Sequence, residues 1–279
     1  ESLKGYVEKF PSQNKAAVSL KGVSAGTLSA ILNGKYDNIS EEMWRNLEAQ
    51  VMPHNQNDYI LVETNNFNDI TFAFEDAREE RDFTWVIGAA GCGKTTTAEC
   101  YRNEHRNVFI VLCDEDMSKI EFIREVCRVM GIKTEGQTKR KMLSMIIDAL
   151  VQLDAPLLIF DEADKLSDTV IQYFITLQNR TRDKCGIACL STPYMLNRLQ
   201  KGLATNKKGF HEIHSRIGRK TYELDDTPDT DIRSICVANG ITDKNQLAEI
   251  HRDAKKYDND LRRVRRAIRR AKKMKQPTI

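Results

Sequence analysis

A glycine-rich run between an apolar segment and a helix-prone segment constrains this chain more than any other feature. Residues 88–95 read Gly88-Ala89-Ala90-Gly91-Cys92-Gly93-Lys94-Thr95, and they follow the apolar residues 83–87. They match G-x-x-x-x-G-K-[ST], in which glycines turn backbone N–H groups around a phosphate and the next helix points its positive end there. We expect Lys94 to reach the β- and γ-phosphates, with Thr96 beside it, and the Thr95 hydroxyl to bind Mg²⁺. A chance glycine-rich turn is the alternative, but strand, spacing and helix together favour a nucleoside triphosphate site.

A short apolar run that ends in acids supplies the second motif. Residues 157–160 follow Pro156 and lead into Asp161-Glu162-Ala163-Asp164. Such a run predicts a buried parallel strand, and open α/β sheets bind ligands at the carboxyl ends of their strands. We expect Asp161 to hold Mg²⁺ through water and Glu162 to polarise the attacking water as general base. The alternative, acids that cap the next helix, suits Asp164 better than the other two.

Length and composition set broad limits. The 279 residues suit about two domains of ~150 residues each. No run approaches the ~20 apolar residues of a membrane span, and no signal-peptide pattern is visible. The seven cysteines form no C-x-x-C pair, which is typical of reduced, packed thiols rather than a metal site. We therefore expect a cytoplasmic protein without a membrane partner.

Positive charge gathers at one end of the chain. Residues 252–275 hold twelve Lys or Arg and three acids, so the rest of the chain is net acidic although the whole carries +3. Clustering of this kind favours a polyanionic partner. A solvated charged helix is the alternative.

The first 60 residues predict a small helical unit. Helices are expected over 14–20, 24–32 and 40–51, with a turn at Lys21-Gly22-Val23 and a polar linker over 53–58. The first pair resembles the helix-turn-helix of phage repressors. On that resemblance, the residues facing a major groove are Ala25, Thr27, Ser29, Ala30 and Lys35, with Asn33 near the edge. Because residues 1–60 hold six basic and seven acidic side chains, protein contact is the alternative.

The remainder alternates strand-like and helix-like patterns. Strands are expected over 83–87, 107–113, 157–160, 186–192 and 220–224, and helices over 118–130, 138–153 and 167–179. From 227 onward only helices are expected, over 228–239, 244–257 and 259–275. This alternation predicts an α/β fold, a five-stranded parallel sheet with helices on both faces. The predicted domains are a helix-turn-helix domain (1–57), the α/β core (58–226) and a basic helical lid (227–279).

Over residues 61–275 this pattern resembles the AAA+ ATPases. The resemblance implies that Ser191 or Thr192 is the first sensor, at the end of the fourth strand. It implies that Arg216, in Ser-Arg-Ile, is an arginine finger for a neighbouring subunit's nucleotide, with Arg219 as the next candidate. Asn259-Asp260-Leu261-Arg262 resembles the second-sensor motif, with Arg262 favoured. Because Asn259 replaces the usual glycine, Arg263 stays an alternative. For each of these arginines, a surface ion pair or a phosphate contact is the alternative to a catalytic role.

The order of the domains narrows the resemblance to the MuB target-capture proteins of Mu-like transposons. It implies ATP and Mg²⁺ as cofactors and a helical homo-oligomeric filament on double-stranded DNA of any sequence. It also implies a DDE transposase that stimulates hydrolysis, releases subunits and uses the bound DNA as target. Expected filament-lining contacts are Lys119, Lys139, Arg140 and Lys141, although solvated charge could explain each of them. The alternatives are a helicase loader or initiator-like ATPase, and a helix-turn-helix transcription regulator switched by ATP.

Overall fold

The centre of the molecule is a parallel β-sheet. The computed structural model describes residues 2–36, 39–51, 59–216 and 221–275, and in these ranges the strands lie in the order β2-β3-β4-β1-β5. Their bounds are β1 Phe83–Ile87, β2 Val108–Leu112, β3 Leu157–Asp161, β4 Gly186–Ser191 and β5 Tyr222–Glu223. The expected α/β class is confirmed, and β5 is shorter than the expected 220–224: Thr221 and Leu224 lie outside the strand, and Lys220 lies outside the described residues.

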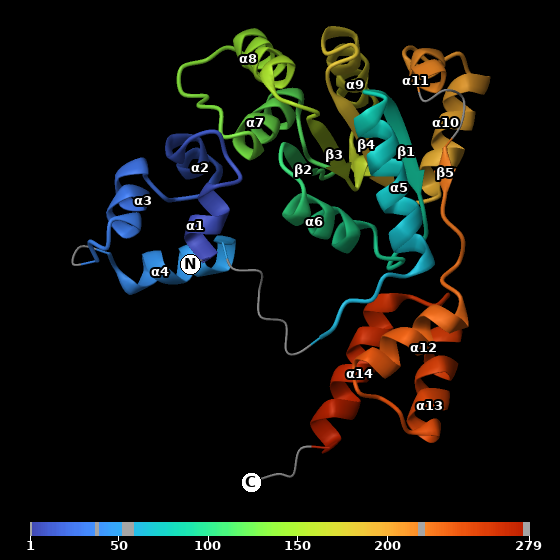
Figure 1. The fold of residues 1–279 in the computed structure, drawn as a ribbon. Coiled ribbons are helices and arrows are strands. Elements are labelled where there is room, and N and C mark those ends of the chain that lie inside the picture. The colour runs from blue at the N-terminus through green and yellow to red at the C-terminus, as the bar shows by residue number, and fades with distance from the viewer. Residues whose placement is uncertain (1, 37–38, 52–58, 217–220, 276–279) are drawn as a thin grey trace.

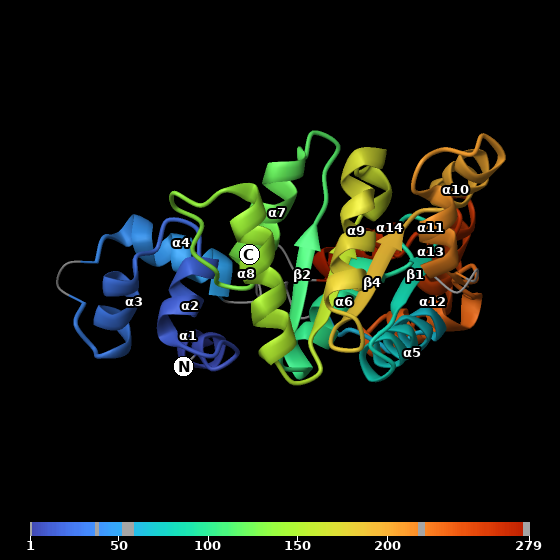
Figure 2. The same cartoon turned by 90° about the horizontal axis from the view of Figure 1, so that it is seen from above.

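Helices cover both faces of the sheet because successive strand side chains point to opposite faces. On one face Leu158 and Phe160 pack with helices α7–α11, and on the other Leu157 and Ile159 pack with α5 and α6 (Figures 1 and 2). These helices are α5 Asn65–Glu79, α6 Lys94–Glu104, α7 Lys119–Val129, α8 Lys139–Gln152, α9 Asp168–Arg180, α10 Tyr194–Ala204 and α11 Phe210–Arg216. Helices α5, α10 and α11 were not predicted from the sequence.

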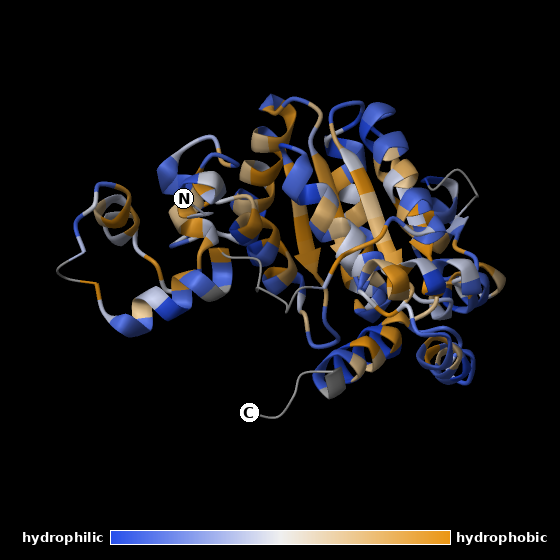
Figure 3. Cartoon of the chain, turned by 60° about the horizontal axis from the view of Figure 1, so that its bottom comes forward, coloured by the Kyte–Doolittle hydropathy of each residue, from blue (hydrophilic) through white to orange (hydrophobic). Residues whose placement is uncertain are grey.

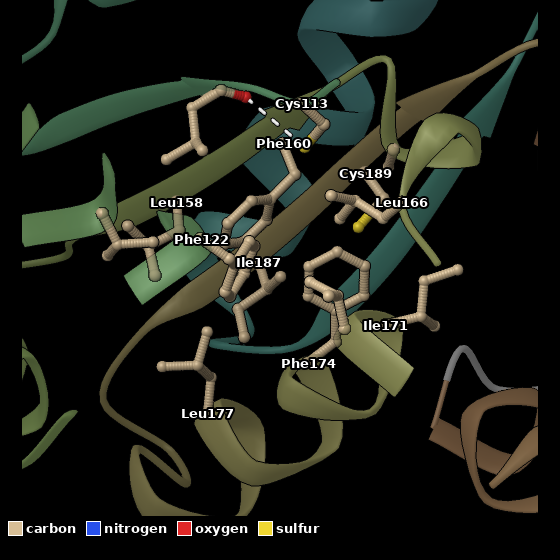
Figure 4. Packing of buried hydrophobic residues seen from close by; sticks show 14 of the residues in the cluster. Cys113, Phe122, Leu158, Phe160, Leu166, Ile171, Phe174, Leu177, Ile187 and Cys189 are labelled. Carbon is tan, nitrogen blue, oxygen red and sulfur yellow. Dashed lines mark hydrogen bonds between the residues drawn. The ribbon is translucent and has the colours of Figure 1, made fainter. Parts of the chain in front are cut away.

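Aromatic rings fill the centre of the larger core. Phe122 of α7 stacks on Phe160 of β3 with ring centroids 5.4 Å apart, and Phe174 of α9 lies 4.8 Å from Phe160 (Figure 4). All three side chains are almost fully buried. Burying such rings stabilises a fold by about 1.5–3 kcal/mol each, so this cluster holds α7 and α9 against the sheet.

The N-terminal helices form a separate small core. They are α1 Ser2–Val7, α2 Gln13–Ser19, α3 Ala25–Leu32 and α4 Glu41–Val51. Their buried apolar residues are Ala16, Ala17, Leu20, Val23, Leu28, Ile31 and Leu47. Helix α1 was not anticipated. The expected linker over 53–58 and the domain boundary at 57 lie outside the described residues.

This N-terminal unit contacts the core through α7 and the end of α6 (Figure 1). The guanidinium of Arg128 donates to the Ser19 carbonyl oxygen at 2.9 Å while it is held by Glu125, and Lys9 Nζ donates to Asn103 Oδ1 at 3.1 Å. The hydrogen bond that Arg128 donates to Glu125 raises the pKa of Arg128. The cation is therefore fixed by its own helix before it binds the neighbouring unit.

The C-terminal helices form a third apolar cluster. Helices α12 Asp229–Ala238, α13 Lys244–Lys255 and α14 Leu261–Lys275 bury residues such as Ile232, Ile250 and Ile268 between them. Helix α14 is mostly hydrophilic along its length (Figure 3). No helix in the described part of the chain combines the length and hydropathy that crossing a membrane requires. All seven cysteines are free thiols, and six are buried.

Gly131 tests the contact between the N-terminal unit and the core. Its φ is +66°, and a Cβ there would lie 2.3 Å from the Lys15 carbonyl oxygen, whereas Gly136 at φ +67° has open space. We expect Gly131→Ala to loosen this contact, since the backbone of α2 must move, and Gly136→Ala to cost only the conformational strain of about 1–2 kcal/mol. Limited proteolysis between residues 52 and 58 measures this: faster cleavage of the Gly131 variant is expected, and equal rates for both variants would contradict it.

Candidate active site

Three strand ends bring the predicted motifs together. The parallel register pairs Ile87 with Ser191, and Gly88 N donates to Ser191 O at 3.1 Å. A cavity of about 230 Å³ opens at this edge of the sheet. The expected residues that line it are Ala90, Gly91, Gly93, Lys94, Thr95, Thr96, Asp161, Glu162, Ser191, Thr192 and Arg262. The remaining loop residues, Gly88, Ala89 and Cys92, lie behind this lining.

The loop over 88–95 wraps its own lysine. Lys94 Nζ donates to the carbonyl oxygens of Gly88 and Ala89 at 2.6 and 2.9 Å and lies 3.6 Å from Cys92 Sγ. These are neutral partners, so the lysine charge has no anion within the loop. Since α6 also begins at Lys94, its N-terminal N–H groups point at the same space. The arrangement fits a phosphate group.

A hydroxyl and a carboxylate meet beside the lysine. Thr95 Oγ1 donates to Asp161 Oδ2 at 2.7 Å, and Glu162 N donates to Asp161 Oδ1 at 3.0 Å. Burial raises the pKa of Asp161, and these hydrogen bonds and the Lys94 charge only partly oppose it. Mg²⁺ in nucleotide sites keeps several waters and phosphate oxygens and needs only one or two protein oxygens. Thr95 and Asp161 fit that requirement, although no group of three metal-ligating side chains occurs in the described ranges.

Glu162 has an unusual backbone and an ionic partner. Its φ is +56°, in the left-handed region that costs a non-glycine residue about 1–3 kcal/mol. Lys165 Nζ donates to Glu162 Oε2 at 2.6 Å, and this hydrogen bond raises the pKa of Lys165. This ion pair engages one of the two carboxylate oxygens of Glu162.

Ser191 and Thr192 both line the cavity but are engaged differently. Ser191 is buried, and its hydroxyl accepts from Trp85 Nε1 at 2.6 Å. The Thr192 hydroxyl donates to the Asp164 carboxylate, which therefore bridges two strand ends instead of capping α9. Arg198 Nη1 donates to the Asp164 carbonyl oxygen at 2.9 Å and so ties this corner to α10.

The predicted arginines occupy distinct places. Arg262 is exposed and lines the cavity. Arg263 turns back into the lid, where it pairs with Asp253 at 3.1 Å and lies over the Tyr257 ring. Arg216 is outside the cavity lining and lies 3.7 Å from Glu212 at the end of α11. Arg219 lies outside the described residues.

The lid contacts the loop directly. Leu261 N donates to Gly91 O at 3.1 Å, and a Cβ at Gly91, whose φ is +83°, would lie 2.0 Å from Asp260 Oδ1. A side chain at position 91 would therefore separate α14 from the loop.

Several cavity residues were not anticipated from the sequence. Most of them are apolar or aromatic and come from the segment before α5, from the first turn of α5 or from the lid: Tyr59, Leu61, Val62, Phe67, Ile235 and Leu261. Thr64 and Arg265 are polar members of the same lining. The side chain of Asn239 pairs with both N and O of Ile60, at 2.9 and 2.8 Å, and so fixes this segment to α12. The apolar run 59–62 after a polar stretch was the available signal.

The predicted DNA contacts lie on two different units. Lys119, Lys139, Arg140 and Lys141 are exposed at the starts of α7 and α8 in the core. Thr27, Ser29 and Lys35 lie on or just after α3 of the N-terminal unit, where Lys35 is exposed and the other two are half-buried. Ala25 and Ala30 are also half-buried, and Asn33 is exposed.

Comparison with known families agrees with this geometry. Residues 77–199 match the family described as the AAA domain. The chain is an ATPase with a region similar to the AAA domain. The matched region spans the loop over 88–95, the β3 acids and the end of β4, whereas the cavity residues over 59–67 and in the lid lie outside it.

Relatives of known name match most of this chain. The "ATP-dependent target DNA activator B" proteins of Escherichia phages D108 and Mu are each 25% identical over 260 residues, covering 91% of this chain and 81% of theirs. The "Mu-like prophage FluMu DNA transposition protein B" of Haemophilus influenzae is 25% identical over 239 residues, covering 81% of this chain and 80% of its own. Among solved structures, a replication initiator DnaA bound to AMPPCP and single-stranded DNA has a similar fold. Its TM-score is 0.50 at 15% identity, over 77% of this chain and 63% of that one.

Lys94 tests the phosphate site. We expect Lys94→Ala to weaken ATP binding by roughly 10- to 100-fold, the scale of losing a hydrogen bond to a charged group. Isothermal calorimetry with ATP measures the affinity. Lys184→Ala, which removes an exposed lysine before β4, is the control and should bind ATP as the wild type does. Equal affinities for the two variants would show that the phosphates bind elsewhere.

Proposed function

We propose that this ATPase binds double-stranded DNA of any sequence in an ATP-dependent manner and presents it as target to a DDE transposase. The carrying observation is the alignment with the target DNA activator B proteins over 91% of the chain, since it extends beyond the AAA domain to most of the terminal helices. The proposed place of action is the cytoplasm of a bacterial or phage-infected cell. The helix-turn-helix assigned to α2 and α3 serves DNA or protein contact in this scheme.

Each residue of the cavity has its own role in the proposed ATP hydrolysis. Bound ATP with Mg²⁺ supplies the phosphoanhydride bond whose cleavage changes the state of the assembly. Lys94 neutralises the phosphates, and Thr95 and Asp161 hold the metal, the latter through water. Glu162 accepts the proton of the attacking water, while Lys165 bonds one of its two carboxylate oxygens. Thr192, held by Asp164, orients that water; we assign it in preference to Ser191, whose hydroxyl is bound to Trp85.

A second subunit completes the site in this proposal. Arg216 does not line its own chain's cavity, and its ion pair with Glu212 is long at 3.7 Å. Both observations support a role in a neighbouring subunit's site. Arg262 supplies the charge from the lid within the same chain. Nucleotide state and assembly on DNA are then coupled, and hydrolysis stimulated by the transposase releases subunits.

Glu162→Gln tests target capture and catalysis together. The change keeps the size of the side chain but removes the base, so ATP should bind while turnover falls by on the order of 10²-fold or more. Electron microscopy with ATP and random-sequence duplex should show filaments that persist longer than those of the wild type. A footprint at one fixed sequence would support the regulator instead, and co-purification with a helicase would support the loader. Normal hydrolysis would mean that another residue activates the water.

Mixing two inactive proteins tests the shared site. Lys94→Ala subunits lack a working cavity but offer Arg216, whereas Arg216→Ala subunits offer a cavity without that arginine. A mixture should regain part of the ATPase activity, because some mixed interfaces pair an intact cavity with an intact Arg216. The effect should be large, since fingers of this kind contribute roughly 10³–10⁵ in rate. Glu212→Gln, which removes the ion-pair partner of Arg216, should retain activity. No recovery in mixtures that still co-assemble on DNA would assign the finger elsewhere, with Arg219 next.

A further inference from the structure

Helix α14 presents a row of cations on one face. Its fifteen residues include nine Lys or Arg and no acid. Arg262, Arg266, Arg270 and Lys273 are exposed and follow one another at intervals of four, four and three residues. Side chains at these intervals share one face of a helix. At a rise of 1.5 Å per residue, successive members lie about 6 Å apart along the axis.

The outer three members of the row are not used by the fold. Arg263 is paired with Asp253, and Arg265 lies over the Tyr59 ring at 4.9 Å, so those two cations hold the lid together. Arg266, Arg270 and Lys273 form no ion pair in the described ranges. We call these three the outer row.

The surroundings of the outer row leave its charge exposed. Arg266 and Arg270 line a groove of about 320 Å³ between α13 and α14, and Glu249 and Asp253 lie on its opposite wall. Asp253 is already bound to Arg263. One carboxylate therefore faces two free guanidinium groups, and Lys273 lies beyond the groove. Like charges this close repel one another, and an anionic partner relieves that cost.

We propose that the outer row binds the phosphate backbone of duplex DNA and that α14 couples this contact to the nucleotide. The inference rests on the proposed DNA binding and assigns its surface to the lid, in place of the starts of α7 and α8. A regular row of free cations without aromatic or amide side chains between them suits phosphates, which carry no sequence information. This fits binding to DNA of any sequence.

The other end of α14 reaches the nucleotide cavity. Leu261 N donates to Gly91 O in the phosphate loop, and Arg262, the first member of the face, lines the cavity. The same helix thus contacts the ATP site with its first turn and DNA with its later turns. Nucleotide that changes the position of the first turn changes the position of the outer row. By linkage, DNA then changes the affinity for ATP by the same factor.

The test removes the outer row and compares it with an equal loss of charge elsewhere. R266Q/R270Q/K273Q is matched by R180Q/R182Q/K184Q, which removes three exposed cations before β4, at the opposite edge of the sheet from the cavity. K139Q/R140Q/K141Q examines the start of α8. Each full-length protein is titrated with a random-sequence duplex at several salt concentrations, with ATP, and its ATP affinity is measured with and without DNA.

We expect the outer-row variant alone to lose duplex affinity, and the slope of log affinity against log salt to fall by up to about 2.7 for three lost phosphate contacts. Its ATP affinity without DNA should stay at the wild-type value, and DNA should no longer raise it. Wild-type-like duplex binding by the outer-row variant, or an equal loss in the R180Q/R182Q/K184Q control, would overturn the inference and leave the proposed function intact. A wild type that binds no duplex with ATP would instead overturn the proposed function.

Discussion

The parallel register between β1 and β4 is the constraint on which the site depends. It aligns Ile87 with Ser191, so the phosphate loop and Thr192 leave the sheet at the same edge, and β3 brings Asp161 there as well. Because parallel strands all end on one side, three segments far apart in sequence need no further device to meet. The aromatic packing around Phe160 keeps β3 in place behind them. A shift in this register would move Lys94 and Thr95 of the loop away from Thr192 and Asp161.

The lid is also fixed to the phosphate loop, through the start of α14. A single backbone hydrogen bond from Leu261 to Gly91, with Asp260 packed against the same glycine, fixes the start of α14 on the loop. The helix is straightforwardly amphipathic, with Val264 and Ile268 in the lid core and its cations outside. Whatever its charged face binds is therefore mechanically connected to the phosphate site through one rigid element.

The place of a residue in the fold could be predicted from the sequence where a single motif includes the strand, loop and helix around that residue. Lys94 and Asp161 could be placed because their patterns define strand, loop and helix together. The apolar wall of the cavity could not be predicted. Tyr59 is held there by a hydrogen bond between Ile60 and Asn239, which are 179 positions apart in the sequence. Asn259 can replace the glycine of the second-sensor motif for a physical reason. Asn259 has φ +55°, a conformation that asparagine tolerates where glycine is usual, and its side chain also binds the Thr227 carbonyl.

The N-terminal unit lies beside one edge of the β-sheet. Strand β2 is an edge strand of the sheet, and residues 108–110 line one groove with Tyr6 and Phe10 of the N-terminal unit. Unpaired edges readily accept a strand from another chain, and proteins limit this by covering them. The N-terminal helices thus shield the sheet from the wrong kind of self-association. This matters for a protein whose proposed assembly is ordered, because disordered strand pairing would compete for the same subunits.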